Sequence, residues 1–140
     1  MATAESCTGG MIAARLVNVS GVSDVFMQGM VTYSNEAKVR LLGVKEETLK
    51  AHGAVSRETA LEMALGGAER AQTDVCVAVT GLAGPGGGSK EKPVGFVYMA
   101  CAVKGKAEVL EYHFKGNRGK IREQSMMKAL DLVRRCVLKA

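Results

Sequence analysis

The chain has 140 residues, of which 47% are hydrophobic and 24% charged, and its formal net charge at pH 7 is +5. This length suits one domain with its own hydrophobic core. No apolar run reaches the roughly 18 residues that a membrane-spanning helix needs, and no basic segment followed by an apolar one opens the chain. We therefore expect a cytoplasmic protein that does not bind membranes.

The four cysteines are widely separated and include no CxxC pair. Neither a disulfide framework nor a zinc site is expected from such spacing, so we predict no metal. The basic residues between Lys115 and Lys139 have no aromatic residues interleaved with them. We interpret them as a solvated helix face and expect no nucleic-acid partner; a nucleic-acid-binding domain would instead show steeply salt-dependent affinity.

Strand-like and helical patterns alternate along the chain, which predicts an α/β fold with a mixed, mostly parallel sheet between helix layers. Met1–Glu5 is barely one strand, so we expect a single domain over residues 1–140 whose amino-terminal helix and part of whose first strand are missing. Further strands are predicted at Met27–Tyr33, Val75–Thr80, Val94–Val103 and Ala107–Phe114, with a turn at Gly105-Lys106.

Helices are predicted from hydrophobic spacing and from capping residues. Ser34 and Ser56 precede two of them as N-caps, and Gly43 is a natural stop. In the last helix we expect Met126, Leu130, Val133 and Val137 to form the packed stripe. The predicted helical segments are Thr8–Val17 after its paired glycines, the helix through Leu42, Glu46–Ala51, Arg57–Ala71 and about Gly119 to Leu138.

The segment Glu5–Gly10 ends a strand and opens a helix through two glycines. Free N–H groups at such an opening favour an anion, and a hydroxyl placed there can become a nucleophile. Ser6 is therefore a candidate nucleophile, with Thr8, Gly9 and Gly10 as candidate substrate contacts. The alternative is that Ser6 or Thr8 merely caps the helix.

Tyr33 ends the second predicted strand, and Lys38 lies about one turn into the helix that follows. A desolvated lysine loses its proton more readily and can act as a base, and a tyrosine can relay a proton. The two side chains could lie over the same end of the sheet. The alternative is a surface lysine beside a packing tyrosine.

A glycine-rich stretch from Thr80 to Ser89 follows a buried strand. Ligands of open α/β sheets collect beyond the carboxyl ends of strands, which makes Gly81 and Gly84 candidate substrate contacts. The stretch matches neither GxGxxG nor the phosphate-binding GxxxxGK[ST], so it predicts no dinucleotide or triphosphate. A solvent-exposed loop is the alternative.

Arg118 and Arg122 lie where the last strand leads into the last helix. A guanidinium group suits a phosphate, so either could hold one, and either could equally be a solvated helix residue.

Together these motifs resemble the CinA carboxyl-terminal domain family, the nicotinamide-nucleotide amidases of PncC type. The resemblance covers essentially the whole chain, and it is carried in order by Ala4–Gly10, Val31–Lys38, Ala51–Ser56, Val79–Pro85 and Glu91–Gly95.

The resemblance implies a three-layer α/β/α fold that converts nicotinamide mononucleotide to nicotinate mononucleotide and ammonia, with no metal and no cofactor. It implies Ser6 as nucleophile, Tyr33 and Lys38 as its proton-handling partners and Thr80 as a further active-site hydroxyl. The family arginine maps to Arg118, less closely to Arg122. We expect a homo-oligomer that binds a small nucleotide as its substrate.

Two alternatives stay open. Cys7 is adjacent to Ser6, and since neighbouring strand residues face opposite ways, only one of the two should reach the site. The other alternative is a non-catalytic module of the same fold that binds a nucleotide or regulates a partner.

Overall fold

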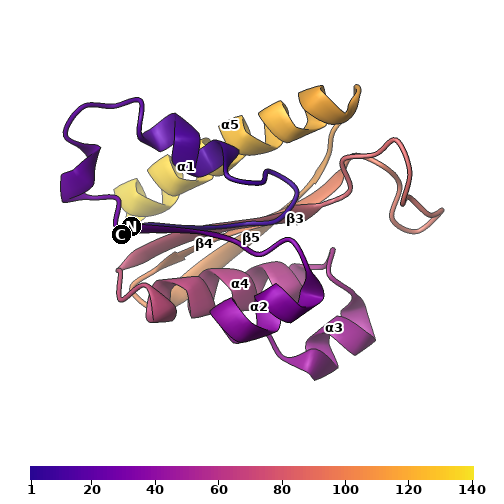
Figure 1. Ribbon diagram of the computed structural model, residues 1–140, viewed down its shortest axis with the longest axis horizontal. Helices are drawn as coiled ribbons and strands as arrows, with labels where there is room; N and C mark the ends of the chain where they lie inside the picture. Colours follow the sequence, from indigo (N-terminus) through magenta and orange to yellow (C-terminus); the bar gives the residue numbers. More distant parts are fainter.

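The computed structural model describes residues 1–140 and contains one five-stranded sheet with helices on both of its faces (Figure 1). The strands are β1 (Ala2–Glu5), β2 (Gln28–Val31), β3 (Val75–Gly81), β4 (Phe96–Val103) and β5 (Lys106–His113). The helices are α1 (Met11–Leu16), α2 (Asn35–Leu42), α3 (Glu46–His52), α4 (Arg57–Arg70) and α5 (Arg118–Lys139), with a 3-10 helix at Val22–Asp24.

The strand order in the sheet is β2-β1-β3-β4-β5. β1 pairs in parallel with β2 and β3 over four residue pairs each, whereas β3–β4 and β4–β5 are antiparallel over seven and eight pairs. The predicted mixed sheet is thus correct, but the expectation that it is mostly parallel is wrong. The reason is that no helix separates β3, β4 and β5 in the chain, and strands joined without a crossover pair antiparallel.

Helices α1 and α5 lie on one face of the sheet, and α2, α3 and α4 lie on the other (Figure 1). Each face buries its own hydrophobic cluster, because successive strand residues point to opposite faces. The face toward α4 carries small side chains, including Ala4, Ala78 and Ala100, whereas the face toward α5 carries larger ones such as Val79 and Met99.

The close approach of α4 depends on two glycines. A Cβ at Gly67 would lie 2.6 Å from the sulfur of Cys76 on β3. A Cβ at Gly66 would lie 1.7 Å from the carbonyl oxygen of Leu42, the last residue of α2. Gly66 therefore allows α2 to rest directly on α4.

The predicted helix ends agree with the structure at several points. The hydroxyl of Ser34 accepts a hydrogen bond from the N–H of Ala37, and Ser56 accepts one from Thr59. Gly43 ends α2 with a φ of 70°. None of the helices is long and apolar enough to cross a membrane.

The predicted stripe of the last helix is offset from the observed one. Val137 is exposed, Leu130 and Val133 are half-buried, and only Met126 of the four is buried. Helix α5 packs on β3 and β4 and also contacts α1. Because of these neighbours, the residues that it buries are shifted by about one position from the predicted apolar stripe. The buried residues are Ile121, Ser125, Met126, Ala129, Leu132 and Cys136.

We expect Gly66→Ala to destabilise the fold. Alanine gains about 1 kcal/mol in helix propensity over glycine, but overpacking costs about 1–3 kcal/mol, and here the clash is with backbone that no rotamer change relieves. Urea unfolding should show a net loss. Gly119→Ala in the first turn of α5 is the control, because the atom nearest to the added Cβ, the Oδ1 of Asn117, would be 3.5 Å away. Equal stability of the two variants would contradict this packing argument.

Candidate active site

Ser6 and Lys38 meet although they lie 32 positions apart in the sequence. Ser6 follows the last residue of β1, and Lys38 is in the first half of α2. The Nζ of Lys38 lies 3.1 Å from the Oγ of Ser6 and donates to the carbonyl oxygen of Thr32 at 2.8 Å. The predicted convergence of hydroxyl and amine is confirmed.

Lys38 is one of the largest fully buried side chains, with 1% of its surface exposed. Burial lowers its pKa below the ordinary value of 10.5, since desolvation disfavours the charged ammonium. No carboxylate forms an ion pair with it to oppose this effect. A lysine in this environment can hold a lone pair and accept a proton from a neighbouring hydroxyl.

The turn after β1 is fixed by Glu5, a buried residue to which the sequence assigned no role. Its carboxylate accepts the N–H groups of Ile12 at 2.9 Å and Ala13 at 3.1 Å. These are the free donors at the opening of α1 that the sequence suggested for an anion. The chain itself supplies the anion there, so this helix end is not open to a substrate.

Ser6 and Lys38 line a cavity of about 250 Å³ at the carboxyl ends of the parallel strands. Of the other predicted site residues, Tyr33, Thr80, Gly81, Gly84 and Arg118 line it as well. The remaining lining residues are Cys7, Ala54, Val55, Leu82, Ala83 and Gly86.

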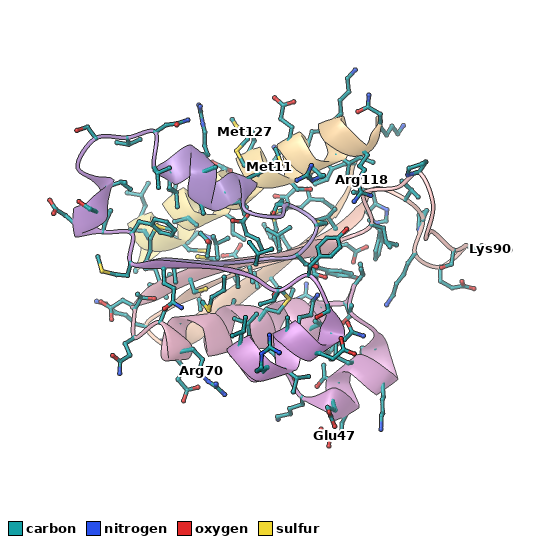
Figure 2. The ribbon with its side chains drawn as sticks, viewed as in Figure 1. Met11, Glu47, Arg70, Lys90, Arg118 and Met127 are labelled. Atoms are coloured by element: carbon teal, nitrogen blue, oxygen red, sulfur yellow. The ribbon has the colours of Figure 1, made fainter.

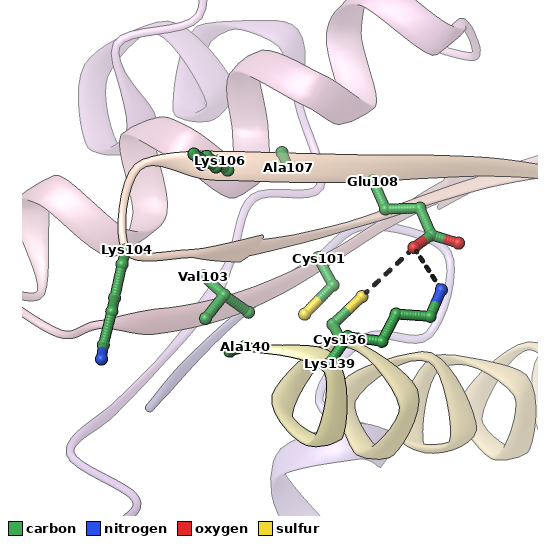
Figure 3. A pocket seen from close by; sticks show the side chains of 9 residues that line it. All are labelled: Cys101, Val103, Lys104, Lys106, Ala107, Glu108, Cys136, Lys139 and Ala140. Atoms are coloured by element: carbon green, nitrogen blue, oxygen red, sulfur yellow. Dashed lines mark hydrogen bonds and ion pairs between the residues drawn. The ribbon is translucent and has the colours of Figure 1, made fainter.

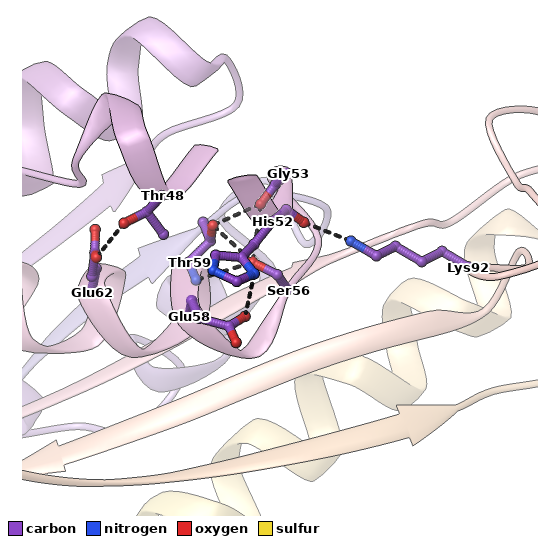
Figure 4. A network of polar contacts seen from close by, with 8 residues as sticks. All are labelled: Thr48, His52, Gly53, Ser56, Glu58, Thr59, Glu62 and Lys92. Carbon is purple, nitrogen blue, oxygen red and sulfur yellow. Dashed lines mark hydrogen bonds and ion pairs between the residues drawn. The ribbon is translucent and has the colours of Figure 1, made fainter. Parts of the chain in front are cut away.

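One wall of the cavity is the segment between α3 and α4, which carries Ala54 and Val55. The hydroxyl of Thr80 donates to the carbonyl oxygen of Ala54 at 2.8 Å and so ties this wall to the end of β3. Figure 4 shows how the wall is held from behind: the hydroxyls of Ser56 and Thr59 both bond the carbonyl of Gly53.

The opposite wall is the loop between β3 and β4, and Lys92 of this loop donates to the carbonyl oxygen of His52 at 2.7 Å. The ammonium of Lys92 thus meets the carboxyl end of α3, where the helix dipole favours a cation. The two walls are linked at both Thr80 and Lys92.

Arg118 lies at the start of α5, beside the loop that carries Lys90 (Figure 2). Its guanidinium donates to the carbonyl oxygen of Gly84 at 2.7 Å and to the hydroxyl of Tyr33 at 3.1 Å. Tyr33 is 64% exposed, so the pair lies toward the mouth of the cavity. Of its five N–H donors, Arg118 uses two in these bonds, which leaves others for a ligand.

Cys7 is also among the residues that line the cavity. It packs in the hydrophobic cluster on the face toward α5, whereas the hydroxyl of Ser6 meets Lys38 of α2 on the other face of the sheet. Burial raises the pKa of the Cys7 thiol to about 11, against smaller lowering effects from its own backbone N–H, Arg122 and Lys38. At neutral pH the thiol is therefore protonated and weakly nucleophilic.

Four predicted substrate contacts, Thr8, Gly9, Gly10 and Arg122, do not line the cavity. Thr8 is fully buried, and Arg122 donates to the backbone of the turn after β1. Their positions correct the sequence-based assignment, which could not tell the cavity side of the turn from its back. The sequence also missed Ala54 and Val55, which carry no chemical signal.

A second cavity, of about 480 Å³, lies between the β4–β5 hairpin and the carboxyl end of α5 (Figure 3). It holds Cys101 and Cys136, whose thiol pKa values are both raised by burial. Glu108 contacts Cys136 and Lys139 there. No hydroxyl lies beside a buried base in this cavity, so we place the candidate chemistry at Ser6.

Comparison with known proteins agrees with the family resemblance of the sequence motifs. The family model described as the CinA C-terminal domain matches residues 1–137. A CinA-like protein from Kosmotoga olearia is 57% identical over 138 residues, which cover 99% of this chain and 34% of that protein. The chain thus spans about a third of the length of the curated relatives it matches.

Solved structures agree in fold. A CinA superfamily protein from Escherichia coli superposes with a TM-score of 0.90 at 37% identity, covering 94% of this chain and 76% of that one. A competence/damage inducible protein from Agrobacterium tumefaciens gives 0.89 at 46% identity, with coverage of 98% and 82%. The chain belongs to the CinA C-terminal domain family.

Proposed function

We propose that the chain hydrolyses the carboxamide of nicotinamide mononucleotide to nicotinate mononucleotide and ammonia, with Ser6 as nucleophile and Lys38 as base. The observation that carries the proposal is the buried contact of 3.1 Å between the Lys38 amine and the Ser6 hydroxyl. The choice of substrate follows the resemblance of the motifs around Ser6, Lys38 and Thr80 to nicotinamide-nucleotide amidases.

In the first step, neutral Lys38 accepts the hydroxyl proton while the Oγ of Ser6 adds to the carboxamide carbon. The Thr32 carbonyl accepts one N–H of Lys38, which orients the amine toward Ser6. Direct transfer is favoured over a relay through Tyr33, whose hydroxyl is engaged by Arg118. The N–H of Cys7, which donates to no oxygen within the chain, or that of Gly81 stabilises the negative oxygen, and such a donor contributes about 2.7–4 kcal/mol.

Collapse of the tetrahedral adduct breaks the carbon–nitrogen bond. Lys38 returns the proton to the leaving nitrogen, so that ammonia departs and a nicotinoyl ester remains on Ser6. Water then attacks the ester with Lys38 again as base, which yields nicotinate mononucleotide and regenerates the hydroxyl.

The ribose phosphate lies toward the cavity mouth in this proposal, against Arg118. The remaining N–H donors of Arg118 suit a phosphate. By binding the phosphate they hold the pyridine ring in place for attack. Thr80 lines the same cavity, and because its hydroxyl proton is donated to Ala54, its oxygen is a candidate acceptor for the carboxamide N–H.

The competing function is a nucleotide-binding or regulatory module without turnover. It predicts that calorimetry detects binding of nicotinamide mononucleotide while no ammonia is released. The buried and unpaired lysine argues for turnover, because binding alone gives no reason to keep an amine next to a hydroxyl at the cost of desolvation.

Ser6→Ala should lower ammonia release from nicotinamide mononucleotide by at least about 10³-fold, as expected when a nucleophile is removed. Cys7→Ala should keep most of the activity, since the Cys7 thiol is protonated at neutral pH. An ammonia assay on the two variants and the wild type decides this. The reverse pattern would transfer the role of nucleophile to the thiol.

The rate should rise with pH until Lys38 is deprotonated and then level off, with the inflection below 10.5 because burial lowers the pKa of Lys38. The stability of the fold should also rise with pH. The folded chain binds fewer protons at Lys38 than the unfolded chain, so the free energy of unfolding increases with pH between the two pKa values of Lys38. The measurement is a pH profile of kcat/KM. Lys38→Arg, which cannot lose its proton, should be inactive; a profile without an alkaline rise would remove Lys38 as the base.

Arg118→Ala should raise the KM for nicotinamide mononucleotide by about 10–100-fold, which corresponds to losing a hydrogen bond to a charged group. The KM for nicotinamide riboside, which lacks the phosphate, should change little. Steady-state kinetics with both substrates test this. Equal increases for both substrates would mean that Arg118 shapes the loop at Gly84 and does not bind phosphate.

A further inference from the structure

Arg122 holds the turn that carries the nucleophile. We call residues Ser6–Gly10 the nucleophile turn. From its place in the first turns of α5, Arg122 donates through Nε to the carbonyl oxygen of Cys7 at 2.9 Å and through Nη2 to that of Thr8 at 3.1 Å. One guanidinium thus binds two consecutive carbonyls directly after Ser6.

These two bonds fix the direction of the backbone N–H groups. Within a planar trans peptide the C=O and the N–H point in opposite directions. Since the carbonyl of Cys7 points at Arg122, the N–H of Thr8 in the same peptide points away from it. The carbonyl of Thr8 likewise directs the N–H of Gly9, which donates to the carbonyl oxygen of Ser6 at 3.0 Å.

The N–H groups of Cys7 and Thr8 donate to no oxygen within the chain. Cys7 lines the cavity together with Ser6, whereas Thr8 does not, so the N–H of Cys7 is the free donor next to the nucleophile on the cavity side. Unpartnered N–H groups beside a nucleophile are the groups that stabilise a developing oxyanion.

The two ends of the nucleophile turn are fixed independently of Arg122. The N–H of Ser6 donates to the carbonyl oxygen of Val79 at 2.9 Å, and Glu5 accepts the N–H groups of Ile12 and Ala13. Between these anchors, the carbonyl of Cys7 has only Arg122 as a partner, whereas the carbonyl of Thr8 accepts the N–H of Met11 at 3.1 Å as well as Arg122. The conformation of this middle section therefore depends in part on one side chain from the other end of the chain.

We propose that Arg122 is a positioning residue that holds the nucleophile turn so that the N–H of Cys7 is directed for stabilising the oxyanion formed on Ser6 attack. This inference rests on the proposed serine mechanism. It assigns Arg122 a role different from phosphate binding, consistent with its position outside the cavity lining and with the use of both its Nε and Nη2 by backbone carbonyls.

The test uses a readout that does not require turnover. The rate constant for phosphonylation of Ser6 by a fluorophosphonate is measured together with kcat and KM for nicotinamide mononucleotide. Arg122→Ala should lower both the phosphonylation rate and kcat by about 10²-fold, as loss of an oxyanion donor does, with KM little changed. Added guanidinium ion should restore part of both rates, which a general loss of stability would not allow.

Arg134→Ala is the matched control, because Arg134 is an exposed arginine of the same helix that pairs only with Asp131. It should leave both rates at the wild-type level and show no response to guanidinium. Arg122→Lys keeps the charge but has no fork for two carbonyls, so it should recover less of the rate than guanidinium does.

The outcomes separate this inference from the proposed function. Phosphonylation of wild-type Ser6 without ammonia release would reject the substrate while the Arg122 comparison still stands. A wild type that does neither would remove the serine mechanism and this inference with it. Wild-type phosphonylation in Arg122→Ala, or an increase in KM for the mononucleotide but not for the riboside, would overturn the positioning role.

Discussion

The burial of the Lys38 amine against a hydroxyl and a single carbonyl is the interaction on which the candidate site depends. A charged ammonium in this place would keep few of the hydrogen bonds that water gives it, and no carboxylate pairs with it. A neutral amine needs fewer partners, and it lies within hydrogen-bond distance of the Ser6 hydroxyl. The same desolvation that lowers the pKa of Lys38 thus makes it suited to remove a proton.

The scaffold keeps this amine in place through close packing. Lys38 is carried by α2, and α2 can rest on α4 only because Gly66 leaves room for the carbonyl of Leu42. The alanine-rich face of the sheet lets α4 approach in turn. Small residues far from the cavity therefore set how deeply the lysine lies.

The site collects residues from the carboxyl ends of all three parallel strands. Ser6 follows β1, Tyr33 follows β2, and Thr80 and Gly81 end β3. β5 ends at the same edge because it is antiparallel to β4, and this brings Arg118 to the cavity mouth. The antiparallel half of the sheet is thus not a departure from the ligand-binding edge of an α/β fold but the means by which the last helix reaches it.

The sequence by itself determined the element order, the helix caps at Ser34 and Ser56, and the identity of the Ser6, Lys38 and Thr80 motifs. These depend on local patterns and on short segments that stay together whatever the rest of the chain does. The strand directions of β3 and β4, the packed face of α5 and the separate contacts of Arg118 and Arg122 were decided only by the tertiary structure. Arg118 and Arg122 are one helical turn apart and chemically identical, so only contacts with residues distant in sequence distinguish them: Gly84 and Tyr33 for one, and Cys7 and Thr8 for the other. Nothing in the local sequence encodes which of two neighbouring arginines meets which distant segment, because that depends on how the whole sheet brings the two ends of the chain together.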